Sequence, residues 1–124
     1  MKKLNEKMAV ELMKVFYPSI RNQISQMHTE HNFGGILQML VEELKTSIAS
    51  NHITKVITGI NRMDYIYQKG NAYVRYMIER LFIKPFSSLK YSAHPQQWKL
   101  ICQEMSDSFL FVYQLHTEKT EIHN

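Results

Sequence analysis

The sequence predicts an all-α protein, built as a single-domain bundle or helical-hairpin array of five to six helices. Apolar residues recur at helical spacing along almost the whole chain, and no stretch alternates with the period of two that indicates a strand. Asn, Gly and Pro residues stand where helices would begin or end. The 124 residues suit one domain over 1–124, with an ordered core of about residues 3–116 and a polar tail over 117–124.

The N-terminal part predicts two helices separated by Pro18, which has no amide hydrogen and fits the first turn of the second helix. Asn5 is the expected N-cap of the first helix. The first apolar stripe consists of Leu4, Met8, Leu12, Val15 and Phe16, and the second of Ile20, Ile24 and Met27. Residues 28–35 (HTEHNFGG) follow, and their two glycines indicate a loop.

The middle of the chain predicts two longer amphipathic helices. The pair Ser50 and Asn51 separates them and offers an N-cap for the second. The first stripe consists of Ile36, Leu37, Leu40, Val41, Leu44 and Ile48. The second consists of Ile53, Val56, Ile57, Ile60, Met63 and Tyr67.

Gly70 and Asn71 predict the end of one helix and the start of the next. Gly70 stands where a helix C-terminus favours left-handed backbone, and Asn71 is an expected N-cap. The next stripe, which Lys84 and Pro85 should end, consists of Val74, Met77, Ile78 and Leu81. After a connection over residues 85–94, the last and longest helix should begin at Pro95, with the stripe Trp98, Ile101, Cys102, Met105, Phe109 and Val112.

The charge is uneven along the chain. Residues 45–99 carry nine Lys and Arg against two acidic residues, a net charge of +7, whereas residues 100–124 have a net charge of −3. No apolar run is long enough to span a membrane. The one cysteine excludes an internal disulfide, and the N-terminal residues lack the features of a signal peptide. We therefore expect a cytoplasmic protein.

Residue patterns typical of enzymes are lacking. His28 and His31 would share a helix face and could ligate a metal, but no second cluster completes a site, so we expect them to be solvent-facing. Cys102 falls in an apolar stripe, which predicts a buried, inert thiol. No phosphate-binding glycine motif and no nucleophile elbow occur. These observations predict no catalytic residue, no metal site and no cofactor.

Tyrosine and basic residues gather around the Gly70–Asn71 break. Tyr and Arg are frequent at protein interfaces and also stack on bases and bind phosphate. The candidate partner-binding residues are Arg62, Tyr65, Lys69, Tyr73, Tyr76 and Arg80. A protein-binding surface fits them better than a nucleic-acid contact, because the cations are spaced rather than clustered. A third interpretation is that these tyrosines only line contacts between helices.

The chain also resembles a family of small uncharacterised bacterial helical proteins that carry a domain of unknown function. The resemblance covers residues 12–113 and rests on a helix ending in FYPS, a glycine-containing loop, two amphipathic helices, KGNAYVRYMIERLF and a Trp-bearing last helix. It implies an all-α fold with no known catalytic residues, and a role in binding a protein, as immunity proteins do. The alternative is a nucleic-acid-binding regulator that uses residues 45–99, and a homodimer remains open.

Overall fold

The computed structural model describes the backbone of residues 2–122 and the side chains of residues 2–115. This part of the chain contains no strand, so the all-α class is confirmed, but it holds more helices than the five to six predicted. In chain order they are α1 (Glu6–Phe16), η1 (Pro18–Ile20), α2 (Arg21–Thr29), α3 (Phe33–Ala49), α4 (Ile53–Lys69), α5 (Ala72–Ile78), η2 (Glu79–Ile83), η3 (Lys84–Ser88), α6 (Leu89–Ser92), α7 (Pro95–Glu104) and α8 (Asp107–Ile122).

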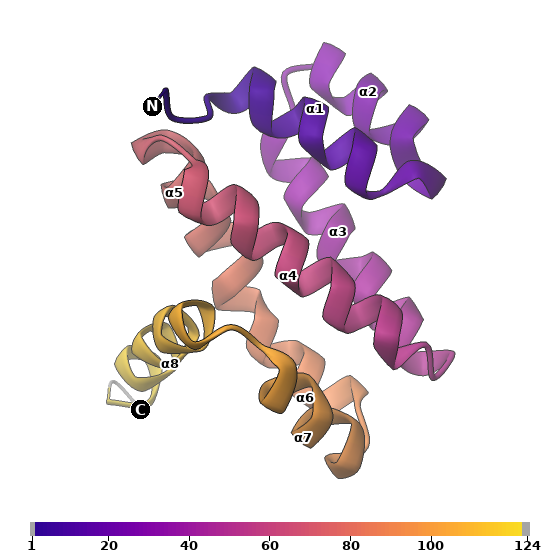
Figure 1. The fold of residues 1–124 in the computed structure, drawn as a ribbon, viewed down its shortest axis with the longest axis vertical. Coiled ribbons are helices and arrows are strands. Elements are labelled where there is room, and N and C mark those ends of the chain that lie inside the picture. Colours follow the sequence, from indigo (N-terminus) through magenta and orange to yellow (C-terminus); the bar gives the residue numbers. More distant parts are fainter. Residues whose placement is uncertain (1, 123–124) are drawn as a thin grey trace.

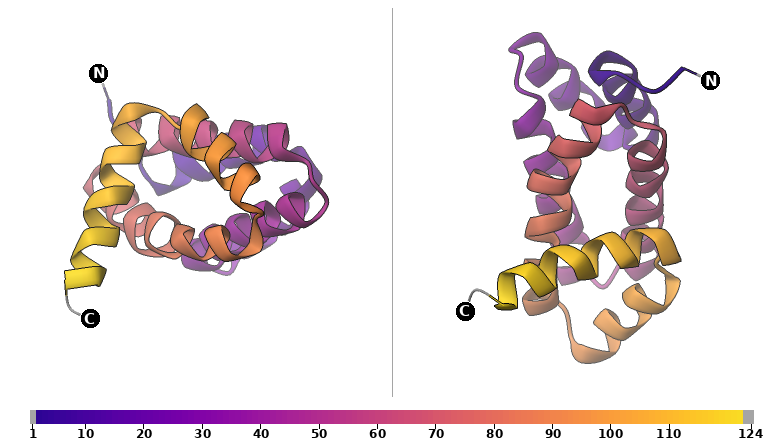
Figure 2. Two further views of the ribbon diagram at one scale, coloured as in Figure 1. Left: turned by 90° about the horizontal axis from the view of Figure 1, so that it is seen from below. Right: turned by 90° about the vertical axis from the view of Figure 1, so that its left-hand side faces the viewer.

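Three helical segments form the body of the molecule. α3, α4 and the continuous run from α5 into η2 lie along the long axis, and α3 contacts both of the others (Figure 1). α1 and α2 pack together at one end, and α6, α7 and α8 cover the other (Figures 1 and 2). α8 crosses this second end at a steep angle to the long helices (Figure 2).

The core of the described residues is entirely apolar. All six residues of the predicted α3 stripe are buried, as are Val56, Ile60, Met63 and Tyr67 of α4. Gly59 lets α3 approach α4 closely, because a Cβ at this position would lie 3.1 Å from Leu44 Cδ2. The strict helical spacing of these stripes therefore predicted the central pair correctly.

The stripe predicted for α1 is out of phase. Ala9, Val10 and Met13 form the buried face, whereas Met8 and Val15 are exposed. Asn5 is the N-cap, as predicted, and accepts a hydrogen bond from the Met8 amide at 2.9 Å. The apolar face of this helix, opposite Lys7, Glu11 and Lys14, is wider than the part that contacts α2 and α4, so spacing alone does not select the buried residues.

The loop predicted over residues 28–35 is mostly helical. His31, with a φ of 58°, ends α2 in left-handed backbone, and the Asn32 amide donates to Met27 O at 2.9 Å. Asn32 then caps α3 by accepting from the Gly35 amide at 2.9 Å. A one-turn connection of this kind, a Schellman motif followed at once by an N-cap, needs no loop. Asn51, with a φ of 58°, likewise ends α3 instead of capping α4.

Gly70 does not adopt the predicted left-handed conformation. Its φ of −71° and ψ of 152° are extended. The extended backbone pairs with the N-terminal segment: the Leu4 amide donates to Lys69 O and the Asn71 amide to Leu4 O, both at 2.8 Å. Asn71 caps α5, as predicted, by accepting from the Val74 amide at 2.9 Å.

Pro85 does not end the helical run. In η2, a π-helical turn, the Lys84 amide donates to Glu79 O, five residues back. This wider turn comes just before the residue that has no amide hydrogen to donate, and the run continues as η3 and α6 through the predicted connection. Phe82, Ile83 and Phe86 are buried as a result.

The predicted last helix is two helices. Met105 is extended, with a φ of −71° and a ψ of 139°, and separates α7 from α8. Ser106 starts α8 by accepting from the Phe109 amide at 3.2 Å. The polar tail expected from Thr117 is helical to Ile122, and its side chains lie outside the described residues.

Candidate functional site

Three of the predicted residues, Tyr73, Tyr76 and Arg80, lie on the run from α5 into η2. We call them the tyrosine surface. The two tyrosines are 49% and 51% exposed. The Tyr73 ring packs 6.2 Å from the ring of Phe33 at the start of α3. Arg80 donates to the Tyr76 hydroxyl at 2.7 Å and lies 5.5 Å from the centre of its ring. Each tyrosine is thus supported from one side and open to solvent on the other.

The other three predicted residues, Arg62, Tyr65 and Lys69, lie on α4. Arg62 donates to the carbonyl of Phe16 at the end of α1 and lies 5.5 Å from its ring centre. Tyr65, half exposed, packs edge-on against the same ring at 6.3 Å. Lys69 is exposed. Among the described residues, no hydrogen bond or ring contact joins this α4 group to the tyrosine surface, so the six residues form two groups.

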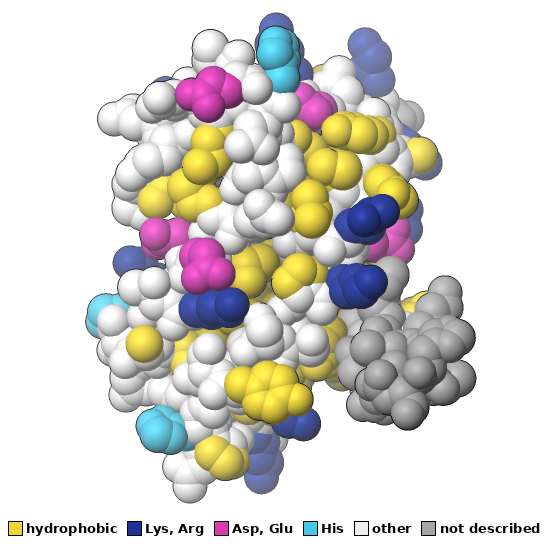
Figure 3. Space-filling view, turned by 180° about the vertical axis from the view of Figure 1, so that it is seen from behind, with side chains coloured by type: hydrophobic (Ala, Val, Ile, Leu, Met, Phe, Trp, Pro, Cys, Tyr) yellow, Lys and Arg dark blue, Asp and Glu magenta, His cyan; other side chains and the backbone are white. Residues whose placement is uncertain are grey.

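All three arginines of residues 45–99 lie over aromatic rings of the molecule. The Arg75 guanidinium lies 4.7 Å from the ring centre of Tyr67, and Arg62 and Arg80 lie over rings as described. Burial raises the pKa of Tyr67, and Arg75 offsets this in part. On the face shown in Figure 3, the Lys and Arg side chains of the described residues are scattered rather than gathered in a stripe.

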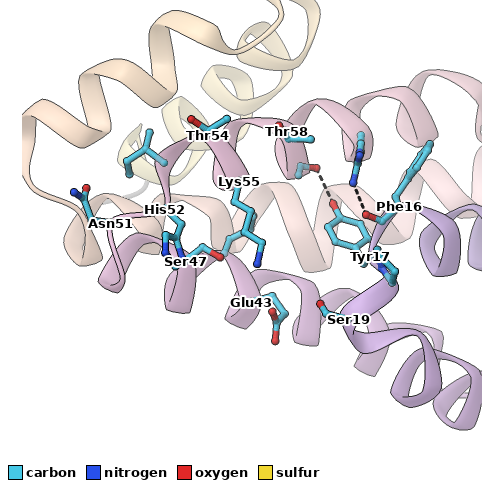
Figure 4. A pocket seen from close by; sticks show the side chains of 15 residues that line it. Phe16, Tyr17, Ser19, Glu43, Ser47, Asn51, His52, Thr54, Lys55 and Thr58 are labelled. Atoms are coloured by element: carbon cyan, nitrogen blue, oxygen red, sulfur yellow. Dashed lines mark hydrogen bonds between the residues drawn. The ribbon is translucent and has the colours of Figure 1, made fainter.

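A cleft that the sequence did not reveal lies between the α1–η1 corner, the C-terminal half of α3 and the N-terminal half of α4. Its volume is about 890 Å³. Phe16, Leu44 and Ile53 supply apolar lining. Lys55 extends from α4 toward α3, where Ser47 and Glu43 face it, and His52 lies at the α3–α4 turn (Figure 4).

Two hydrogen bonds fix the α1–η1 corner against α4. The Tyr17 hydroxyl donates to Gly59 O at 2.7 Å, and Arg62 donates to Phe16 O (Figure 4). Burial strongly raises the pKa of Tyr17, with a small opposing effect of Arg62. No sequence pattern predicts these bonds, because they join residues 42 and 46 positions apart.

The residues considered for metal binding or nucleophilic chemistry are dispersed. His28 lies in α2 and pairs with Glu6 of α1 at 3.3 Å, so it is not a solvent-facing loop residue as predicted, whereas His31 is exposed. Cys102 is half-buried rather than buried, and burial raises its pKa. Within the described residues, no three His, Cys, Asp or Glu side chains gather where a metal ion could bind, and no helix is long and apolar enough to cross a membrane.

Comparison with known proteins identifies a family but no characterised relative. The model of a family described as a domain of unknown function, DUF7674, matches residues 10–119. No curated protein matches the chain, and no solved structure matches it.

Proposed function

Because the chain belongs to the DUF7674 family, whose domain has no known function, we propose a function from the geometry of its surface: the protein acts by binding another protein through the tyrosine surface. In this proposal it is a non-enzymatic bacterial protein of the cytoplasm, of the immunity or adaptor type. Its partner contacts the run from α5 into η2.

The supporting observation is the way in which Tyr73 and Tyr76 are held. Each ring is half exposed and rests against a partner, Phe33 for Tyr73 and Arg80 for Tyr76. A side chain that is already fixed loses little conformational entropy on binding, and a tyrosine can bury a large area while its hydroxyl keeps a hydrogen bond. Both features favour a protein interface.

The alternative, a nucleic-acid-binding regulator, needs cations that are free to contact phosphates. Arg62, Arg75 and Arg80 lie over aromatic rings of the protein, and Lys45 pairs with Glu42 at 3.4 Å. These contacts hold four of the nine Lys and Arg side chains of residues 45–99 against the protein, so fewer are free to reach phosphates, and the protein-binding role is better supported.

A site-specific photo-crosslinking experiment tests the proposal. A photoreactive amino acid replaces Tyr76 in the protein expressed in its own host, and a second sample carries it at Tyr91, which is 89% exposed on α6. We expect one stoichiometric crosslinked protein from position 76 and none from position 91. A crosslinked species of twice the mass of the chain would identify the partner as a second copy.

A triple variant, Tyr73→Ala/Tyr76→Ala/Arg80→Ala, should lose co-purification of that partner, whereas Tyr91→Ala should retain it. Removing hot-spot side chains of these types weakens binding by at least about tenfold. Circular dichroism establishes that both variants are folded. Retention of the partner by the folded triple variant would contradict the proposal, and a salt-sensitive gel shift with DNA or RNA in place of a protein crosslink would favour the alternative.

A further inference from the structure

The cleft between α3 and α4 contains polar groups that the protein itself does not use. The Lys55 ammonium, the Glu43 carboxylate and the Ser47 hydroxyl have no hydrogen bond or ion pair with any described residue. His52 precedes α4, but its side chain does not cap the helix. Polar groups that converge on a cleft without partners can bind a ligand without first breaking an internal contact.

The walls of the cleft are fixed before any ligand binds. The corner is held by the bonds from Tyr17 to Gly59 and from Arg62 to Phe16. At the opposite end, Asn51 of the α3–α4 turn accepts a hydrogen bond from Gln97 of α7 at 2.8 Å. A preformed cleft reduces the entropic cost of binding, and its 890 Å³ lies within the range of about 300–1,000 Å³ that is usual for small-molecule pockets.

The lining indicates the chemistry of the ligand. The ring of Tyr17 and the side chain of Ile53 offer apolar contact, and Lys55 offers a positive charge that has no ion pair with a described residue (Figure 4). The first amides of α4, which no side chain caps, add to the positive potential at this end. Glu43, on the α3 wall, disfavours a second negative charge toward the corner.

We propose that this cleft binds a small amphipathic anion: an apolar, preferably aromatic body with a single carboxylate, sulfonate or phosphate group. Lys55 binds the anionic group, and the body lies between Ile53 and the ring of Tyr17. The site is separate from the tyrosine surface, so it does not depend on the proposed protein contact.

Two fluorescent probes of nearly the same shape test the site. Anilinonaphthalene sulfonate carries one negative charge, and phenylnaphthylamine has the same rings without the charge. The folded protein should bind the sulfonate more tightly than the neutral probe. Lys55→Met should weaken sulfonate binding about threefold, the effect of one partly exposed ion pair, and leave the neutral probe unchanged. Lys90→Met, which removes an exposed cation of α6 outside the cleft, should change neither.

Binding must also be located, because both probes bind exposed apolar surface in general. Amide chemical-shift changes on titration should be confined to the corner, the second half of α3 and the first half of α4. Thr58→Trp, which places a large ring in the cleft, should weaken both probes. Equal effects of Lys55→Met and Lys90→Met, shift changes elsewhere in the protein, or full binding by the folded Thr58→Trp variant would overturn the proposal.

Discussion

Two glycines differ in what an added methyl group would meet. At Gly70, a Cβ would lie 2.7 Å from Val74 Cγ1 and 3.1 Å from the backbone oxygen of Ile66. At Gly34, the nearest atom is the flexible end of Leu81, at 3.1 Å. The backbone of Gly70 is extended and suits any residue, so close packing alone requires glycine there.

Gly70→Ala should therefore lower the free energy of unfolding by about 1–3 kcal/mol, as overpacking does. Gly34→Ala, within α3, should change it by less than about 0.5 kcal/mol, since alanine favours the helix and Leu81 can move. Urea unfolding of the two variants measures both values. A loss at Gly34 as large as that at Gly70 would contradict this explanation.

The part-buried phenol of Tyr17, whose pKa is raised, predicts a loss of stability at alkaline pH. Below about pH 10 the phenol is neutral in both the folded and the unfolded protein. Above it, the unfolded chain loses the proton while burial keeps it on the folded one, so the free energy of unfolding falls as pH rises. Tyr67, whose pKa is also raised, contributes in the same direction.

The Tyr17→Phe variant separates the contribution of Tyr17 to this pH dependence from that of Tyr67. Near neutral pH the variant should be less stable than the wild type by about 1 kcal/mol, because the hydrogen bond to Gly59 O is lost. Between about pH 10 and pH 11.5 the difference should shrink and then reverse, since the variant has no proton to lose at this position. Urea unfolding at several pH values checks this, and a constant difference across the range would exclude the assignment to Tyr17.

At the scale of elements, the sequence predicted helices well where the core selects one face. The α3 stripe is correct in every residue, whereas the apolar face of α1 is wider than its buried part, which depends on contact with α2 and α4. Boundaries were harder to predict. One-turn connections made residues 28–35 resemble a loop, and the in-phase stripe from Trp98 to Val112 concealed the break at Met105. The serine and aspartate that follow Met105 are the N-terminal signal that could have revealed it.

The start of α8 depends on Ser106. Its hydroxyl accepts from the Phe109 amide and donates to Asp64 of α4 at 2.7 Å. Ser106→Ala removes both bonds and should lower the free energy of unfolding by about 1–2 kcal/mol. Ser108→Ala, the matched control, loses an exposed 3.3 Å hydrogen bond from Gln68 and a 3.5 Å contact with the Ser106 hydroxyl, and should cost less than about 0.5 kcal/mol. Chemical unfolding compares the two, and equal losses would show that Ser106 does not hold α8.

At the scale of the whole molecule, the candidate sites depend on contacts that spacing does not reveal. The sequence located the tyrosine surface, because Tyr73, Tyr76 and Arg80 flank the buried stripe of one helix. It did not assign Arg62 to the end of α1, and it did not predict the cleft, which needs three separate elements to meet. Residue type and helical phase predict exposure along one helix, whereas a cleft is a property of the tertiary arrangement.

At the scale of the whole molecule, the N-terminal segment before α1 also bridges the end of α4 and the start of α5. Leu4 pairs with the backbone on both sides of Gly70, so residues far apart in sequence close the α4–α5 turn. Removing residues 1–4, by cleavage of a fusion so that the chain begins at Asn5, removes two backbone hydrogen bonds and the packing of Leu4. It should lower the free energy of unfolding by about 2–3 kcal/mol. Asn5, the cap of α1, is retained.

Hydrogen exchange of the Asn71 amide distinguishes the backbone pairing of Leu4 from the packing of its side chain, because this amide donates to Leu4 O. In the deletion variant the amide has no partner in the segment and should exchange much faster than in the wild type. Leu4→Ala keeps the backbone pairing and loses only the side chain, so its Asn71 amide should remain protected while part of the stability is lost. Unchanged protection of Asn71 after the deletion would show that the α4–α5 turn holds its shape without the segment.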